Sequence, residues 1–491
     1  MNHAASLPDQ RGDIQAVLAS GFGWLECSRF WLMTIKNAPD SVPLARAWIQ
    51  ALHATNLVQS IEQVRVQIAK KPKPPQLAAI AFSHAGLRTL GLVESAEFPF
   101  PTAFRSGMGS ELREKLLRDD SREEWGWSDA EAAVGKRRVV HILLALWWTK
   151  GELPPVLPNE ALAFDKIEVQ GCPSFFNNGN LYEPFKFRDG VSQPVIYGLK
   201  DNIDASPFVP TSKTKNGPDA DPNPDQVIAA GEFILGYRNE YDELSYCPNV
   251  VGWRPPPHAP AGAHFGLNGS YLAVRQIEQD IEKFAEAEAL SAPGCPAGVA
   301  LVEAMMGRRR DGTPLELPAQ NTPLPDLEAN GFRYRLKDQN GFTTPRGSHI
   351  RRANPRDMLA HDVESGIASS KLHRLLRRGR PYRDIVEREP TAGLFFIACN
   401  TDLERQFEFV HQRWLRNPRF ADLEDEDDPF VGTISHNKKF SMQGLPSGTS
   451  VAPFKSFTAT IGGGYFFLPG LKALEFLVSF VPAGARGRID S

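Results

Sequence analysis

The chain of 491 residues carries a formal net charge of −3, and 42% of its residues are hydrophobic. These values are typical of a globular protein with two or three domains, and they exclude a strongly basic protein that is drawn to nucleic acid or to an anionic membrane. We therefore expect small molecules as partners.

Strand and helix patterns alternate in the first part of the chain. The apolar runs at residues 30–35 and 139–148 have the length of buried strands. Between them, residues 41–52 place their apolar side chains on one face and predict a helix with Ser41 as its N-cap. The alternation at residues 64–68 predicts a further strand. This succession favours a sheet with helices on one face.

A boundary follows at residues 201–230, where five prolines stand among Asp, Asn and Lys. Proline interrupts helices and central strands, so we expect two domains, residues 1–220 and 221–491. The second domain repeats the pattern of the first. Its predicted strands are at residues 232–236, 270–274, 394–398 and 464–468. Its one clear amphipathic helix is predicted at residues 277–289. Two similar α+β halves with mostly antiparallel sheets are the expected architecture.

Cysteine usage indicates the compartment. The five cysteines are scattered, with no CxxC pair and no CxxCH haem-attachment motif. The N-terminal residues contain no basic, apolar leader, and nowhere do roughly 18 apolar residues follow one another. We expect a cytoplasmic protein with reduced thiols and no membrane span.

One histidine stands among arginines in residues 347–357, GSHIRRANPRD. His349 is followed by Arg351, Arg352 and Arg356. A neutral imidazole can bind a metal while guanidinium groups hold the acidic edge of a large anionic cofactor, and haem fits this description. The alternative is a solvated basic loop.

Two further segments carry candidate chemistry. Asp189 lies in FKFRDGVSQP (185–194), where Asp-Gly is also a common tight-turn pair. Arg377 lies in LHRLLRRGRPYRD (372–384), which also has the pattern of a cationic helix end, with Gly379 as the C-cap and Pro381 as the stop. The two segments and the histidine segment form one ordered set.

The chain resembles the dye-decolorizing peroxidases, which are haem enzymes, from about Asp13 to Val481. The matching segments include FRDGVSQP, NGSYLAVRQIEQD, GRRRDGTPL, SHIRRANPRD, RRGRPY and GGGYFFLPG. The resemblance is to the longer class of the family, without secretion signals. It implies two ferredoxin-like α+β halves, with one non-covalent haem b in the C-terminal half.

The resemblance also implies roles for individual residues. His349 matches the axial ligand of the haem iron. Asp189 matches the acid/base that takes a proton from hydrogen peroxide, and Arg377 matches the arginine that stabilises the developing negative charge. The implied function is oxidation of dyes and phenolic or other aromatic compounds by one-electron steps, best at acidic pH. The alternative is a haem-binding or haem-handling protein with little turnover.

Other expectations concern the cofactor's surroundings. A carboxylate is needed for the second imidazole nitrogen of His349, and Asp402 is the first candidate, with Glu404 and Glu408 as competitors. Leu394 and Phe396 are expected to line the pocket. Arg352 and Arg356 are assigned to the haem propionates, whereas Arg351 is expected to point outward.

Two departures from the family pattern bear on the site. Lys186 replaces the first glycine of the Gly-x-x-Asp-Gly loop, and lysine does not tolerate positive φ as glycine does. The path of the loop that carries Asp189 is therefore in question. Residues 361–373 have the look of an inserted loop.

Overall fold

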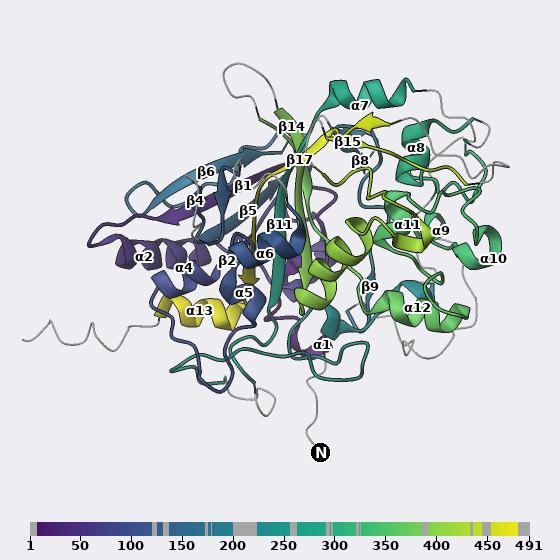
Figure 1. Ribbon diagram of the computed structural model, residues 1–491. Coiled ribbons are helices and arrows are strands. Elements are labelled where there is room, and N and C mark those ends of the chain that lie inside the picture. Colours follow the sequence, from purple (N-terminus) through teal and green to yellow (C-terminus); the bar gives the residue numbers. More distant parts are fainter. Residues whose placement is uncertain are drawn as a thin grey trace, which may run out of the picture.

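One large, mostly antiparallel β-sheet runs through the molecule in the computed structural model (Figure 1). The structure describes residues 7–119, 125–130, 137–171, 175–177, 179–199, 223–255, 263–290, 295, 298–320, 324, 326–384, 391–432, 436–443 and 453–479. The predicted domain boundary at residue 220 and residues 201–222 of the proline-rich segment lie outside these ranges.

The sheet has the strand order β12-β14-β11-β17-β2-β5-β1-β6. Its N-terminal strands are β1 (Cys27–Ile35), β2 (Gln76–Phe82), β5 (Ile142–Trp148) and β6 (Phe164–Gln170). Its C-terminal strands are β11 (Ser270–Gln279), β12 (Leu376–Arg377), β13 (Arg380–Asp384), β14 (Thr391–Asn400) and β17 (Thr458–Leu468). Short strands complete the fold: β3 (Trp127–Ser128), β4 (Arg138–Val139), β7 (Phe176–Asn177), β8 (Asn180–Leu181), β9 (Val195–Ile196), β10 (Val227–Ile228), β15 (Asn437–Lys438) and β16 (Phe454–Lys455).

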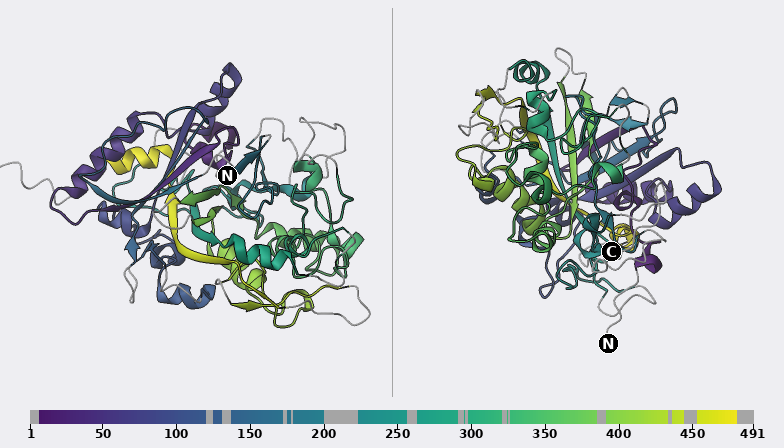
Figure 2. Two further views of the ribbon diagram at one scale, coloured as in Figure 1. Left: turned by 90° about the horizontal axis from the view of Figure 1, so that it is seen from above. Right: turned by 90° about the vertical axis from the view of Figure 1, so that its right-hand side faces the viewer.

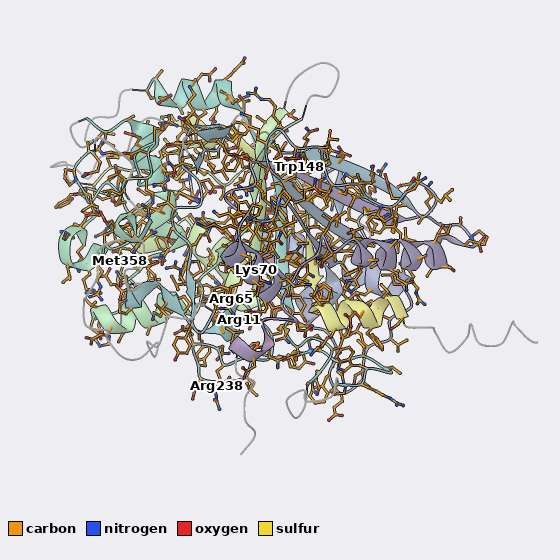
Figure 3. The ribbon with its side chains drawn as sticks, turned by 180° about the vertical axis from the view of Figure 1, so that it is seen from behind. Arg11, Arg65, Lys70, Trp148, Arg238 and Met358 are labelled. Carbon is orange, nitrogen blue, oxygen red and sulfur yellow. The ribbon has the colours of Figure 1, made fainter. Side chains whose placement is uncertain are left out.

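Each half of the molecule has its own set of helices. The helices at the N-terminal half are α2 (Ser41–Ala54), α3 (Ile61–Lys70), α4 (His84–Thr89), α5 (Thr102–Ser106), α6 (Glu111–Leu117) and α13 (Leu471–Ser479). The principal helices of the C-terminal half are α7 (Ile281–Glu288), α8 (Leu301–Met306), α10 (Tyr334–Asp338), α11 (His349–Ala353) and α12 (Val363–Lys371), followed by π-helical turns η6 (Glu404–Glu408) and η7 (Val410–Leu415). Trp148 at the end of β5 and Met358 beyond α11 lie in opposite halves (Figure 3).

The two halves share strands and core. Phe467 of β17 pairs with Phe82 of β2, which joins the two groups of strands. The C-terminal helix α13 returns to the N-terminal half and packs against α2 (Figure 2, left). One apolar cluster therefore contains residues from both halves, among them Phe82, Tyr271 and Leu474.

Most of the predicted strands are confirmed, but three elements differ. Residues 64–68 are helical because Ser60 and Gln63 form a capping box that starts α3. The strand predicted at residues 232–236 is wrong, because residues 230–232 form a short 3-10 turn and the chain continues through residues 233–236 as turns. The amphipathic helix starts at Ile281 and not at residue 277, since β11 continues to Gln279 and Asp280 caps the helix through Lys283 N.

The segment at residues 361–373 is ordered as a helix. Asp362 accepts a hydrogen bond from Ser365 N and starts α12. Among the residues that the structure describes, no helix has the length and apolar character needed to cross a membrane.

Candidate haem pocket

The candidate residues meet around a cavity of about 270 Å³ in the C-terminal half. His349, Asp189 and Arg377 line it, as do Leu394 and Phe396. The wall combines the loop at residues 183–192 with parts of β11, α11, β14, the π-helical turns and β17. Segments that are far apart in the sequence thus converge on one site, although Asp189 belongs to the predicted N-terminal domain.

His349 is the first residue of α11, and its ring is anchored on one side. Ser348, just before it, donates a hydrogen bond to Ala304 O at 2.6 Å. The Nδ1 atom of His349 lies 2.9 Å from Asp428 Oδ2, so Nδ1–H donates to this carboxylate and Nε2 is left for a metal. Burial opposes the charge of Asp428, but its hydrogen bond with His349 and the positive charges of Arg352 and Lys438 hold its pKa below the ordinary value.

The expected partner of His349 is therefore wrong. Asp402 is exposed and accepts a hydrogen bond from Arg405 N, at the start of the π-helical turns. Glu404 and Glu408 both bind Arg113. Asp428 was not predicted from the sequence because it lies in an acidic run, although its side chain is fully buried. Acidic runs are usually solvated, so only the fold distinguishes this carboxylate.

The three arginines after His349 are buried structural groups. Arg352 donates to the carbonyl oxygens of Trp414, Asn417 and Glu426. Arg356 donates to the carbonyls of Asn330 and Phe332. These guanidinium groups supply hydrogen-bond donors to main-chain carbonyl oxygens in irregular segments. Their assignment to the propionates is thus not supported.

Arg351 is equally buried, which contradicts the expectation that it points outward. It forms an ion pair with Asp338 at 2.9 Å and donates to Thr344 O at 2.7 Å.

Other donors in the wall fit an anionic cofactor. Arg309 Nε and Asn354 Nδ2 are buried, and neither has a hydrogen-bond partner among the described residues. Both residues line the cavity. Unpaired buried donors are costly unless a ligand accepts from them. Together with the free Nε2 of His349, this donor set fits haem, which can take one nitrogen ligand from the protein and carries two carboxylates. Arg309 belongs to the GRRRDG segment, where its role was not foreseen.

Asp189 and Arg377 come from two segments that are tied together. Asp189 Oδ1 accepts a hydrogen bond from Gly190 N at 2.6 Å. Arg377 is in β12, and its main-chain N–H donates to Gln193 Oε1 at 3.0 Å. Its side chain donates to Ser192 O at 3.3 Å. The strand that carries the cation therefore holds the loop that carries the carboxylate.

Lys186 keeps the turn type that glycine favours. Its φ is 68°, in the left-handed region. Glu183, three residues earlier, is a second carboxyl in the cavity wall. Burial raises the pKa of Glu183 to about 7, and the charge of Asp189 acts in the same direction.

Comparison with known proteins points to one family. A family model described as Dyp-type peroxidase, C-terminal, matches residues 258–425. The chain is 30% identical over 500 residues to the multifunctional dye peroxidase DyP2 of Amycolatopsis sp., with 95% of this chain and 92% of that protein covered. It is 25% identical over 474 residues to the dye-decolorizing peroxidase msp1 of Mycetinis scorodonius, with 88% and 82% covered.

Solved structures share the fold. A DyP-type peroxidase of Anabaena sp. superposes with a TM-score of 0.67 at 20% identity, with 96% of this chain and 95% of that chain covered. A fungal DyP-type peroxidase from Auricularia auricula-judae gives 0.65 at 20% identity, with 96% and 99% covered. The expected ferredoxin-like α+β fold is confirmed by these similarities.

Proposed function

Because the chain belongs to the dye-decolorizing peroxidase family and is a peroxidase that oxidises dyes with hydrogen peroxide, we propose that His349, Asp189 and Arg377 carry this activity with one non-covalent haem b. The observation that carries the proposal is the anchored imidazole of His349 in the wall of a cavity that Asp189 and Arg377 also line. When bound, the haem would supply an iron that binds peroxide and would pass the two oxidising equivalents of peroxide to aromatic compounds in one-electron steps.

The protein groups have separate tasks. Asp428 keeps the proton on Nδ1 of His349, so Nε2 presents its lone pair to the iron. Arg309 and Asn354 would donate to the propionates in place of Arg352 and Arg356. Leu394 and Phe396 limit water in the cavity.

Proton transfer falls to Asp189. Its ionised carboxylate takes the proton from peroxide and returns it to the departing oxygen, which leaves as water. Arg377 stabilises the negative charge that develops as the O–O bond breaks. We also propose an acidic activity optimum with phenols and dyes, because the reduction of peroxide to water consumes protons.

Composition supports two further proposals. Among the described residues, Cys247, Cys295 and Cys399 are free thiols, which is typical of a reducing cytoplasm. The net charge of −3 favours small-molecule partners over nucleic acid. The haem-handling alternative is less well supported. A carrier needs no acid and no cation beside the cofactor, whereas Asp189 and Arg377 both line this cavity.

Rapid mixing of the haem-loaded protein with peroxide tests the assignments. Asp189→Ala and Arg377→Ala should each slow the change in the Soret band by roughly 10²- to 10⁴-fold, because each removes a group that acts during O–O cleavage. His349→Ala should lose haem or its normal spectrum. Asp402→Asn is the control and should react as the wild type does. A wild-type rate in Asp189→Ala would remove Asp189 from the proposed mechanism.

A further inference from the structure

The loop that carries Asp189 is a tight hairpin closed by main-chain hydrogen bonds. Asp189 N donates to Leu181 O at 2.8 Å, and Glu183 N donates to Phe187 O at 3.0 Å. Between these bonds, Lys186 N donates to Glu183 O at 2.7 Å. This is the pattern of a three-residue hairpin turn whose last position is left-handed, a position that usually holds glycine. Here it holds Lys186, with φ 68°.

The side chain of Glu183 folds back over this turn. Its Oε1 accepts a hydrogen bond from Phe187 N at 2.8 Å, and its Oε2 accepts one from Phe185 N at 3.1 Å. These two amides flank Lys186 on either side. Gln279 of β11 donates to the same Oε2 at 2.6 Å, so the carboxyl is also attached to the large sheet.

This carboxyl has an unusual setting. Glu183 is only 9% exposed and lines the cavity. Within the described part of the chain, its hydrogen-bond donors are two main-chain amides and one neutral amide side chain, so no ion pair there offsets its burial. The role of Glu183 follows from these hydrogen bonds. They fix the backbone on both sides of Lys186, and lysine disfavours the left-handed conformation that Lys186 adopts.

We propose that Glu183 is a positioning residue for the peroxide reaction, because its carboxyl clamps the left-handed turn at Lys186 and thereby sets the position of Asp189. Only Phe187 and Arg188 lie between Lys186 and Asp189, and their path is fixed further by Arg188 N, which donates to Arg310 O at 2.9 Å. Relaxation of the turn would displace the carboxylate of Asp189, and a misplacement of about 1 Å costs roughly 10²-fold in rate. This inference rests on the proposed role of Asp189.

The test combines a loss with a specific rescue. Glu183→Gln keeps the shape of the side chain but replaces one acceptor oxygen by a donor, so one flanking amide loses its acceptor. We expect kcat/KM for peroxide to fall by about tenfold or more, while the KM for a dye, the Soret spectrum and the haem affinity stay at wild-type values. Glu282→Gln, which changes an exposed carboxyl at the start of α7, is the matched control.

The rescue variant is Glu183→Gln with Lys186→Gly. Glycine adopts positive φ without a clamp, so the double variant should recover most of the lost kcat/KM. A wild-type rate in Glu183→Gln overturns the inference, and so does a slow Glu183→Gln that Lys186→Gly fails to rescue.

Asp189→Ala separates this failure from failure of the proposed function. If Asp189→Ala is slow while Glu183→Gln is fast, only the role of Glu183 is wrong. If Asp189→Ala reacts at the wild-type rate, the assignment of Asp189 is wrong, and the inference about Glu183 is overturned with it.

Discussion

At the scale of single residues, the pair of His349 and Asp428 decides how the cofactor is held. Asp428→Asn keeps the size of the side chain but removes its negative charge, so the imidazole loses a strong acceptor. We expect the affinity for haem to fall about 10- to 100-fold, which is the usual cost of losing such a supporting partner. Titration of the haem-free protein followed by the Soret band measures this change.

Asp402→Asn provides the matched comparison for that experiment. Asp402 is exposed and caps the π-helical turns, a position that asparagine fills equally well. Its haem affinity should equal that of the wild type. Equal losses in the two variants would contradict the assignment of Asp428.

Substitutions of Arg352 and Arg309 distinguish an effect on protein stability from an effect on haem binding. Arg352→Met removes the donors to three or more buried carbonyl oxygens. The free energy of unfolding should therefore fall by about 3 kcal/mol or more. Arg309→Met removes an orphaned donor in the cavity wall and should weaken haem binding with little change in the unfolding of the haem-free protein. Urea unfolding and haem titration of both variants measure the two effects, and a reversed pattern would restore Arg352 as a propionate ligand.

Sequence motifs located the residues with the most distinctive chemistry and missed those whose roles depend on the fold. His349, Asp189 and Arg377 lie in segments with a recognisable residue order, and all three reach the cavity. Asp428 follows His349 by 79 positions, in a run that is indistinguishable from a solvated acidic loop. Arg352 and Arg356 bear the same charge as a propionate ligand, and only their carbonyl partners reveal another role.

At the scale of elements, the sequence predicted correctly a strand whose residues are all buried. The all-buried run of β5 was recognised from its apolar length. The alternation at residues 64–68 was misleading, because Ile61 and Val64 of α3 are buried with a helical spacing while Val66 stays exposed. The π-helical turns have no sequence signature, and they turn Glu404 and Glu408 toward Arg113 rather than toward His349.

The side chain of Gln406 connects these π-helical turns to other segments of the C-terminal half through hydrogen bonds. Its Oε1 accepts from the N–H groups of Thr401 and Asp402, and its Nε2 donates to the carbonyls of Glu232 and Arg374. Gln406→Leu leaves these groups without partners, so we expect a loss of about 2 to 4 kcal/mol in the free energy of unfolding.

A second glutamine in the same segment gives the comparison. Among the described residues, the Gln412 side chain donates only to Leu116 O, and it is half-buried, so Gln412→Leu should cost about 1 kcal/mol or less. Urea unfolding at one pH compares the two variants. A loss in Gln406→Leu no greater than in Gln412→Leu would mean that the π-helical turns do not depend on this amide.

At the scale of the whole molecule, buried titratable groups act on stability in opposite directions. Burial lowers the pKa of His141 and of His411 to about 4. The unfolded chain then binds more protons between pH 4 and 6.5, so these histidines reduce stability as the pH falls through this range. Glu183 has a raised pKa of about 7. The folded state then binds the extra proton, so Glu183 reduces stability as the pH rises from about 4.5 to 7.

Glu183→Gln isolates the second effect. The wild type should lose up to about 3 kcal/mol from Glu183 between pH 4.5 and 7.5, since one pKa unit corresponds to about 1.4 kcal/mol. The variant has no carboxyl at this position and should not show this loss. The stability difference between wild type and variant should therefore shrink as the pH rises. Urea unfolding at the two pH values measures it, and a constant difference would show that Glu183 titrates normally.

The joining of the two halves was beyond sequence analysis, because it depends on contacts between distant segments. The sequence indicated two α+β halves, yet their sheets are continuous through the pair between Phe467 and Phe82, the pairing of β3 with β17 and the bridge between Gly171 and Tyr382. Helix α13, which ends the described chain, packs on α2 near its beginning. Shared strands and a shared apolar cluster favour unfolding of the two halves as one unit.

Leu474→Ala tests this cooperativity. Leu474 of α13 is fully buried in the shared cluster, so the variant should lose about 2 to 5 kcal/mol in the free energy of unfolding. If the halves unfold together, the midpoint from tryptophan fluorescence and the midpoint from the Soret band of the haem-loaded protein shift equally in urea. Lys472→Ala, on the exposed face of the same helix, should leave both midpoints in place. A shift in fluorescence alone would mean that the haem half unfolds independently, and that α13 stabilises only the sheet on which it lies.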